Sequence, residues 1–481
     1  MRYTDWGIGG NPPVSDWQRR RHSANNESAG AALHRRALSA SRPGFLGLSP
    51  YHWVVIAAGW AGWGFDVFDA VLFNFVAPDC IPALLHLTPG SRAAREASVF
   101  WTGALTSMLL LGWALGGVLF GWVADRIGRK RALIATITLY AAGTALCALV
   151  SNIGQLIACR LLASLGIGGE WGIGAALVAE SVPEERRVEA GVIMQTGSPL
   201  GVVLAGAVNY QIAGVWLAAD PRDSWRYVFL AGLLPVLVAL GVRLFLRESA
   251  HWTASDARTR PSTPRELFGP RMRAATLSGV FAAVIAVLAW WACNAFIPLL
   301  GRTLAAEDAA SAGLLPAAAR QLAASWQAHA SNAFNLGGLL GAFAAVPLAK
   351  RLGRRPMFIA YFLFSALALF ATFGPVLAPQ TRLSMLFFVG AGVYGIFGAF
   401  TFYLPELFPA RLRATGAGFC YNIGRVFAAS GPFVIGLVTA AAGGSSGALM
   451  RVMCWLALVP LGAALLARFV LLETRGRTLP V

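Results

Sequence analysis

The chain has 481 residues, of which 57% are hydrophobic and only 13% are charged. Soluble domains carry roughly 25% charged residues, so this composition excludes an ordinary soluble protein and indicates a membrane protein. The net charge of +17 at pH 7 indicates membrane orientation signals and an anionic lipid surface, and it does not indicate a nucleic-acid partner.

The first fifty residues, 1–50, form a polar tail before the first apolar stretch. The tail lacks an apolar core within roughly its first 15 to 30 residues, where a signal peptide would need one. We therefore expect a disordered cytoplasmic extension, with the first membrane helix serving as the insertion signal.

Twelve apolar stretches follow the tail, and each is long enough to cross about 30 Å of hydrocarbon at about 1.5 Å per residue. The first six lie near residues 53–78, 101–123, 132–150, 155–179, 188–213 and 226–246. The second six lie near residues 274–300, 329–349, 357–378, 382–404, 414–441 and 450–472. We predict an all-α polytopic membrane protein with twelve transmembrane helices in two six-helix halves, residues 51–246 and 274–481, joined by a cytoplasmic linker over residues 247–273.

The basic residues are distributed unevenly between the two sides of the predicted membrane. When the tail is placed in the cytoplasm, 28 of the 39 lysines and arginines fall on the cytoplasmic side and eight on the opposite side. Cytoplasmic loops of membrane proteins carry such an excess of Lys and Arg. Because twelve spans return the chain to its starting side, we expect both termini in the cytoplasm. The expected location of the protein is the inner membrane of the cell.

Three charged loop motifs of the first half recur in the second half at a nearly constant spacing. Residues 125–130, Asp-Arg-Ile-Gly-Arg-Lys, recur 225 positions later as Lys-Arg-Leu-Gly-Arg-Arg. The pattern Glu180-x-x-Pro-x-x-x-Arg187 recurs as Glu406-x-x-Pro-x-x-x-Arg413, and Glu248 after the sixth span recurs as Glu473 after the twelfth. The halves therefore resemble a duplication, an architecture that is typical of secondary transporters.

The repeated motif also resembles a known family. Residues 121–130, Gly-Trp-Val-Ala-Asp-Arg-Ile-Gly-Arg-Lys, are similar to the signature between helices 2 and 3 of the major facilitator superfamily, and the resemblance covers roughly residues 50–478. Residues 405–416 and 473–477 look like sugar-porter motifs. Residues 66–69, Asp-Val-Phe-Asp, and 168–171, Gly-Gly-Glu-Trp, resemble motifs of the aromatic-acid and sialate/lactate proton symporters. Val67 departs from the symporter motif, which carries Gly there, and Lys350 departs from the second-half signature, which usually carries Asp.

The resemblance implies a secondary active transporter that works by alternating access. Its organic-acid branch implies proton-coupled symport of a small organic anion, such as a monocarboxylate, an aromatic acid or a sialate-like acid. The alternative is a sugar porter, either proton-coupled or facilitative, which the sugar-porter motifs favour. A third possibility is a membrane receptor built on the same fold, although such receptors usually carry a long soluble signalling extension that this chain lacks.

Two carboxylates in the first span predict a proton site, because a charge in a membrane helix costs roughly 2.5–3.5 kcal/mol on insertion scales and is functional by default. Asp66 and Asp69 are three residues apart and share a helix face. Asp69 and Arg160 of the fourth span are expected at similar depths, roughly 24 and 22 Å from the cytoplasmic boundary. The resemblance implies that this pair couples proton movement to transport, and the competing interpretation is a permanent ion pair. Glu170, roughly 15 Å nearer the cytoplasm, is a second proton site, a cavity residue or a protonated acid between helices.

An arginine near the membrane midplane predicts the substrate site. Arg425 lies roughly 18 Å into the eleventh span, where transporter substrates bind between the two halves. A guanidinium holds a carboxylate through two hydrogen bonds, whereas the competing interpretation pairs Arg425 with an acid of a neighbouring helix as a gate. Gln195 matches a substrate-binding Gln of sugar porters. Further candidates at mid-depth are Asn294, Trp291, Tyr394 and Asn422, each of which also suits helix packing.

Charged residues at the cytoplasmic helix ends are expected to lock the halves together when the site opens outward. A single exposed ion pair contributes only about 0–1 kcal/mol, so a lock needs a network. The predicted network comprises Asp125, Arg126, Gly128, Arg129, Glu180, Arg187, Glu248, Arg354, Glu406, Arg413 and Glu473.

The sequence carries no pattern for catalysis, a metal or a cofactor. The six cysteines form no C-x-x-C pair, and the chain has no G-x-x-x-x-G-K-[ST] phosphate loop and no Ser-His-Asp cluster. We expect neither an enzyme nor an ATP-driven pump, and we expect coupling to an ion gradient or to none. The predicted partners are a small-molecule substrate, a proton and the lipid bilayer, with the protein acting as a monomer.

Overall fold

The computed structural model describes residues 47–127, 129–183, 186–218, 220, 222–233, 237, 241, 264–409 and 412–475. The chain divides into two compact units, Met1–Trp53 and Val54–Val481, and the second unit holds every site discussed below. Most of the predicted tail, most of the predicted linker and the end of the sixth predicted span lie outside the described residues.

The helices of the N-terminal half coincide with the first five predicted spans and with the start of the sixth. The fifth predicted span is broken into three consecutive pieces. The elements are α2 (Pro50–Leu84), α3 (Arg92–Ile127), α4 (Arg129–Cys147), α5 (Ile153–Ser181), α6 (Arg187–Gln195), α7 (Gly197–Asn209), the π-helix η3 (Tyr210–Trp216) and α8 (Ser224–Ala231).

The C-terminal half also contains six spans, and three of them are broken into two helices. A short 3-10 helix precedes the first of them. The elements are η4 (Pro264–Phe268), α11 (Arg273–Ser311), α12 (Pro316–Leu352), α13 (Arg354–Phe373), α14 (Pro379–Val393), α15 (Phe397–Glu406), α16 (Arg413–Ala428), α17 (Ser430–Ala441), α18 (Ser446–Trp455) and α19 (Leu458–Val470).

The described part of the chain contains nine helices, some of them broken, that are long and apolar enough to cross a membrane. Of the other three predicted spans, two coincide with α4 and α5, and the start of the third coincides with α8. Large apolar side chains point outward from several of these helices, among them Val118 at 70% and Phe469 at 83% exposure. Outward apolar surface of this extent is what a lipid environment favours.

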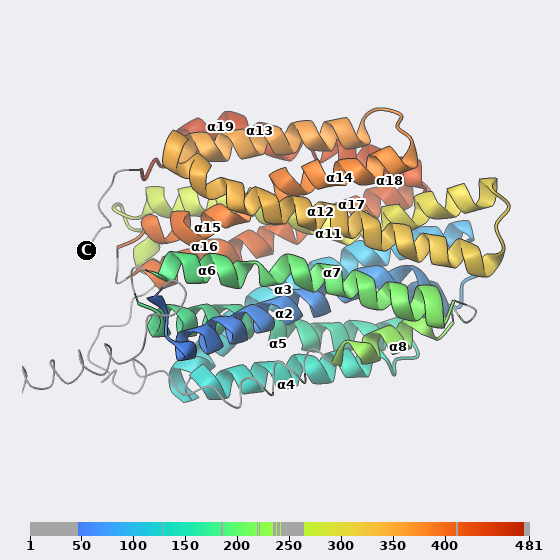
Figure 1. Cartoon of the computed structure of the whole chain (residues 1–481), viewed down its shortest axis with the longest axis horizontal. Coiled ribbons are helices and arrows are strands. Elements are labelled where there is room, and N and C mark those ends of the chain that lie inside the picture. The colour runs from blue at the N-terminus through green and yellow to red at the C-terminus, as the bar shows by residue number, and fades with distance from the viewer. Residues whose placement is uncertain are drawn as a thin grey trace, which may run out of the picture. The chain divides into compact units, whose positions relative to one another are not determined.

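The two halves pack side by side, with the helices of each running nearly parallel to those of the other (Figure 1). Helix α12 contacts α7 and η3, while α17 contacts α3. At the second of these contacts the backbones touch, because a Cβ atom on Gly103 would lie 2.3 Å from the Pro432 carbonyl oxygen. We call the end of the bundle with the α2–α3 and α11–α12 loops the far end, and the end with the α12–α13 loop the terminal end.

Candidate functional site

The predicted pair of Asp69 and Arg160 meets inside the N-terminal half. Arg160 Nη1 lies 3.9 Å from Asp69 Oδ2, and both side chains are almost fully buried. The other Asp69 oxygen accepts a hydrogen bond of 2.6 Å from the Thr144 hydroxyl. The sequence therefore placed both residues at the correct relative depth.

The geometry of this pair is looser than that of a direct ion pair. The Arg160 guanidinium donates to the backbone carbonyls of Asp69 and Ala70, at 3.3 and 3.0 Å. The nearer carboxylate oxygen, Asp69 Oδ2, accepts no hydrogen bond within the described part of the chain. Arg160 is thus held on α2 by backbone acceptors, so the Asp69 carboxyl can gain or lose a proton without the arginine losing its own hydrogen bonds.

Arg425 of α16 lies in an aromatic cage built from both halves of the protein. Its guanidinium carbon lies 4.6 Å from the centre of the Trp113 ring, which belongs to α3, and 4.5 Å from the Tyr421 ring. Its Nη1 donates to the Asn422 side-chain oxygen at 2.9 Å. A guanidinium over an aromatic face is stabilised electrostatically, by about 2 kcal/mol or more when it is desolvated.

The aromatic cage continues as a chain of rings across the interface between the halves. Trp63 lies 6.0 Å from Trp113, which lies 5.6 Å from Trp291. Trp291 lies 4.8 Å from Trp290, which lies 5.3 Å from Tyr394. Two of these contacts are edge to face and two are tilted, so the rings form an apolar aromatic wall next to a cation.

Asp66, the other acid of the first span, belongs to the half opposite to that of Arg425. The two charges interact electrostatically, and Asp66 is fully buried. The two acids of the first span therefore differ in their surroundings: Asp69 lies 3.9 Å from Arg160, whereas the charge of Asp66 acts on Arg425. The sequence placed both acids on one helix face and did not predict this division.

Two predicted substrate residues, Gln195 and Tyr394, line one pocket between the halves. Each stands at a break in its span: Gln195 ends α6, and Tyr394 follows the end of α14. Helix breaks at mid-membrane expose backbone groups and are tolerated where they line a cavity. The rest of the pocket is mainly apolar, with lining residues Thr196, Pro199, Gly338, Leu339, Ala342, Phe343, Phe397 and Gly398.

The remaining candidates have mainly structural contacts. The Asn294 amide donates to the Trp290 carbonyl of its own helix at 3.1 Å, and Asn422 orients Arg425. Trp291 belongs to the ring chain described above. Glu170 is buried within α5, ten residues beyond Arg160, as its position in the sequence requires.

Three members of the predicted charged network bond to one another at the terminal end of the C-terminal half. Arg354 pairs with Glu406 at 2.7 Å. The Glu473 carboxylate accepts hydrogen bonds from the backbone N–H groups of Arg354, Arg355 and Arg475, at 2.9, 3.0 and 2.9 Å. Burial opposes the charge of Glu473, but these three donors outweigh it and hold its pKa below the usual glutamate range.

The other members of the network lie outside what can be described. Gly128 and Glu248 are outside the described residues, and so are the side chains of Asp125, Arg126, Arg129, Glu180, Arg187 and Arg413. The lock between the halves therefore stays a prediction. The three described members hold together helices of one half.

A metal site is not found among the described residues, where no three His, Cys, Asp or Glu side chains lie close enough to hold an ion. The site thus consists of one buried arginine in an aromatic cage, two buried acids and a pocket between two six-helix halves.

A family profile described as "Sugar (and other) transporter" matches residues 83–265 and 305–478. The chain belongs to the sugar (and other) transporter family. The transporter is therefore a multi-pass membrane protein of the major facilitator superfamily, as residues 121–130 indicated, and proteins of this family are not enzymes.

Several curated relatives are similar over most of the transporter's length. A probable 4-methylmuconolactone transporter of Cupriavidus pinatubonensis is 31% identical, over 89% of this chain and 92% of the relative. A cis,cis-muconate transport protein of Acinetobacter baylyi is 30% identical, over 79% and 88%. A gentisate transporter of Corynebacterium glutamicum is 26% identical, over 82% and 83%.

Solved structures share the fold of the transporter. A D-xylose–proton symporter superposes with a TM-score of 0.68 at 18% identity, over 89% of this chain and all of that chain. A bacterial homologue of the lysosomal transporter Spinster superposes with a TM-score of 0.65 at 20% identity, over 88% and 98%. The predicted fold of twelve helices in two halves is confirmed.

Proposed function

We propose that this transporter moves a small organic anion together with a proton, and that Arg425 holds the anion's carboxylate. The observation that carries the proposal is the buried Arg425 guanidinium between Trp113 and Tyr421. A cation at that depth needs an anionic partner, and a planar acid can offer both a carboxylate to the arginine and a ring or conjugated chain to the aromatic wall.

The relatives support an organic acid as the substrate. Their names include a gentisate, a muconate and a muconolactone transporter, so an acid derived from an aromatic ring is the substrate class that we propose here. Asp66, which is fully buried, is proposed to balance part of the charge of Arg425 when no anion is bound.

Asp69 is the proposed proton carrier, with Arg160 controlling the charge of its carboxyl group. At a separation of 3.9 Å the Arg160 guanidinium acts on the Asp69 carboxyl, and a helix movement that changes this separation would change that effect. Asp66, Glu170 and Gln195 are proposed to complete the proton and substrate sites.

The proposed setting is the inner membrane, with both termini in the cytoplasm and the terminal end facing the cytoplasm. The tail, residues 1–50, and the linker, residues 247–273, are proposed to lie on the same side. We propose that one chain suffices for transport, because the described site is built from the two halves of a single chain.

Uptake into proteoliposomes tests the proposal. Labelled gentisate, cis,cis-muconate and D-xylose are offered to the same vesicles with and without a pH gradient that is acidic outside and neutral inside. The proposal predicts accumulation of at least one acid that depends on the gradient, with no accumulation of D-xylose. Gradient-driven accumulation of D-xylose alone would replace the anion proposal with the sugar-porter alternative.

A further inference from the structure

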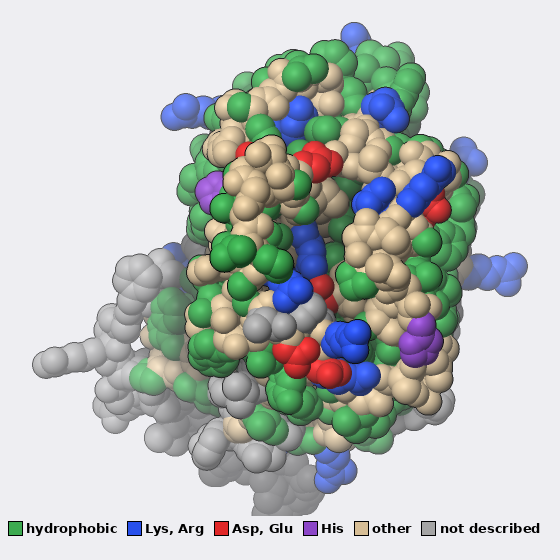
Figure 2. All heavy atoms as spheres, turned by 90° about the vertical axis from the view of Figure 1, so that its right-hand side faces the viewer, with side chains coloured by type: hydrophobic (Ala, Val, Ile, Leu, Met, Phe, Trp, Pro, Cys, Tyr) green, Lys and Arg blue, Asp and Glu red, His purple; other side chains and the backbone are tan. Residues whose placement is uncertain are grey.

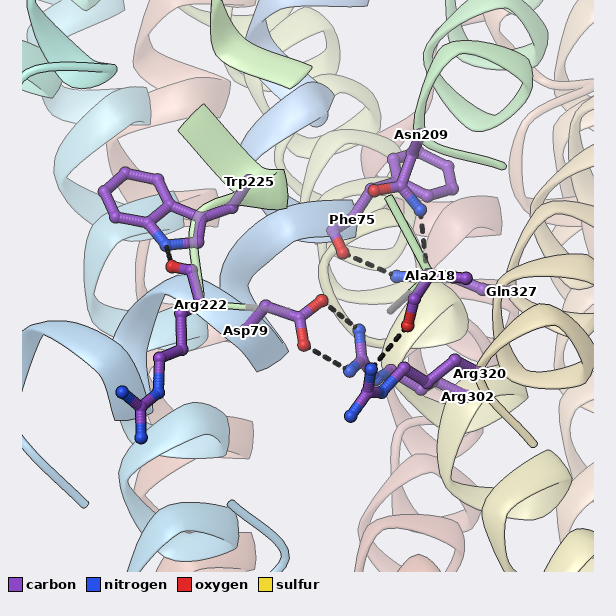
Figure 3. Close-up of polar contacts among 9 residues, drawn as sticks. All are labelled: Phe75, Asp79, Asn209, Ala218, Arg222, Trp225, Arg302, Arg320 and Gln327. Carbon is purple, nitrogen blue, oxygen red and sulfur yellow. Dashed lines mark hydrogen bonds and ion pairs between the residues drawn. The ribbon is translucent and has the colours of Figure 1, made fainter. Parts of the chain in front are cut away.

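An ion pair between the halves stands at the far end of the bundle, away from the site. Arg302 of α11 donates two hydrogen bonds to Asp79 of α2, at 2.6 and 2.5 Å, one to each carboxylate oxygen. Figure 3 shows the two side chains pointing directly at each other. Parallel hydrogen bonds between a guanidinium and a carboxylate are among the strongest polar contacts in proteins.

Further contacts between the halves surround this pair on the same part of the bundle. The Asn74 amide donates to the Asn294 carbonyl at 3.1 Å. The Gln327 amide donates to the Phe75 carbonyl at 2.9 Å and accepts from Asn209 at 3.3 Å. Figure 3 also shows Arg320 donating to the Ala218 carbonyl. All of these contacts join the N-terminal half to the C-terminal half.

The halves must separate at the far end at one stage of every transport cycle, because alternating access opens the site to each side in turn. Separation of α2 from α11 breaks both hydrogen bonds of the Asp79–Arg302 pair at once. The amide contacts are neutral, and Arg320 makes one hydrogen bond to a neutral carbonyl. The pair, with two hydrogen bonds between opposite charges, is therefore the strongest polar contact to be broken in this group.

The exposure of the pair suits a contact that breaks and re-forms. The Arg302 side chain is 25% exposed and the Asp79 side chain is 15% exposed. A fully exposed pair would contribute almost nothing, and a fully buried pair would leave two dry charges when it broke. At the far-end surface, which Figure 2 shows with acidic and basic side chains around a central hollow, water can reach both groups as they part.

We propose that Asp79 and Arg302 form a latch that holds the far end closed and must break for the transporter to open on that side. The latch acts through the two helices that carry it and does not touch the substrate. The inference depends on alternating access, and it does not depend on which substrate is carried.

Distance measurements by electron spin resonance test the latch without any substrate. Spin labels are placed on Ala93→Cys and Leu315→Cys, two exposed far-end positions on opposite halves. Cys159 and Cys454, the two cysteines that are only partly buried, are replaced by serine throughout. We expect Asp79→Asn and Arg302→Gln each to raise the population of long distances by about three- to tenfold.

A double-mutant cycle separates the latch from two unrelated effects. If the residues act through their mutual contact, the Asp79→Asn/Arg302→Gln double variant opens the far end no more than either single variant does. Asp223→Asn is the matched control, because it makes the same chemical change in a pair, 3.0 Å long, that lies within the N-terminal half. We expect this control to leave the distances unchanged.

Two results would overturn the latch: unchanged distances in both single variants, or additive effects in the double variant. Arg302→Lys covers the case in which Arg302→Gln does not fold, since it keeps the charge and loses the two parallel hydrogen bonds. For Arg302→Lys we expect a smaller rise in the population of long distances. Unchanged distances in this variant would also reject the latch. If the distance measurements give the results expected for the latch but no organic anion is taken up by proteoliposomes, the proposed function alone is rejected.

Discussion

Trp113 and Arg425 come from opposite halves of the chain, yet the guanidinium carbon of Arg425 lies 4.6 Å from the centre of the Trp113 ring. The contact joins α3 to α16 at the centre of the protein. A movement of the two halves against each other therefore changes the surroundings of the arginine, which links the occupancy of the site to the conformation of the bundle.

Trp113→Leu tests the role of this ring. We expect the apparent affinity for the transported acid to fall by about fivefold, because the cation loses its aromatic partner and its fixed position. The measurement is the concentration dependence of uptake in proteoliposomes. Trp101→Leu in the same helix is the matched control, since the Trp101 ring packs edge to face against Phe100 at 5.3 Å and lies twelve residues from Trp113. An unchanged affinity in Trp113→Leu, or an equal loss in the control, contradicts the role.

Asp69→Asn mimics a permanently protonated acid beside Arg160. We expect it to abolish accumulation driven by a pH gradient while exchange of preloaded substrate continues, because exchange needs no net proton movement. Asp66→Asn is compared under the same conditions to show which acid of the first span carries the proton. Gradient-driven accumulation that survives in Asp69→Asn would reject the proton role of this residue.

Gly103→Ala tests the close packing of α3 against α17. The new methyl group would lie 2.3 Å from the Pro432 carbonyl oxygen, and overpacking of this kind costs typically about 1–3 kcal/mol. We expect a lower apparent melting temperature in detergent. Gly191→Ala is the control, because no neighbouring atom lies within 4 Å of a Cβ there and alanine is the better helix former. Equal melting temperatures for Gly103→Ala and the unchanged protein would show that the helices are not in direct backbone contact.

The lowered pKa of Glu473 predicts a pH dependence of stability. Since folding lowers the pKa of this carboxyl, the folded state binds its proton less readily than the unfolded state does. The stabilisation is therefore present above the ordinary glutamate pKa of about 4.3 and is lost as the pH falls through the lowered value. We expect the difference in melting temperature between the unchanged protein and Glu473→Gln to be largest near neutral pH and to shrink in acid. A difference that stays constant down to acid pH contradicts this account.

The sequence predicted the spans well because apolar length is a direct physical requirement of the bilayer. Its main error in extent concerns α11 and α12, which run to Ser311 and begin at Pro316, beyond the predicted ends at residues 300 and 329. These extensions are rich in alanine, a strong helix former, but they are too polar to be counted as spans. Hydropathy marks where a helix can cross lipid and does not mark where the helix ends.

The sequence also brought Asp69 and Arg160 together, since depth along two helices follows from residue number alone. It could not show which rings surround Arg425, because Trp113 lies in an apolar span with no polar pattern that marks its inward face. Asp79 and Arg302 were missed for another reason. Charges near the ends of spans are expected as topology signals and interface anchors, and only the fold shows that these two face each other.

The most direct test of the central claim compares an acid with a sugar at Arg425. Binding of the transported acid and of D-xylose is measured for the unchanged protein and for Arg425→Lys, which keeps the positive charge but loses the planar fork of donors. The account predicts that affinity for the acid falls by about tenfold or more, while any binding of D-xylose changes far less. Unchanged affinity for the acid in Arg425→Lys, or an equal loss for D-xylose, would contradict the claim that Arg425 holds the carboxylate.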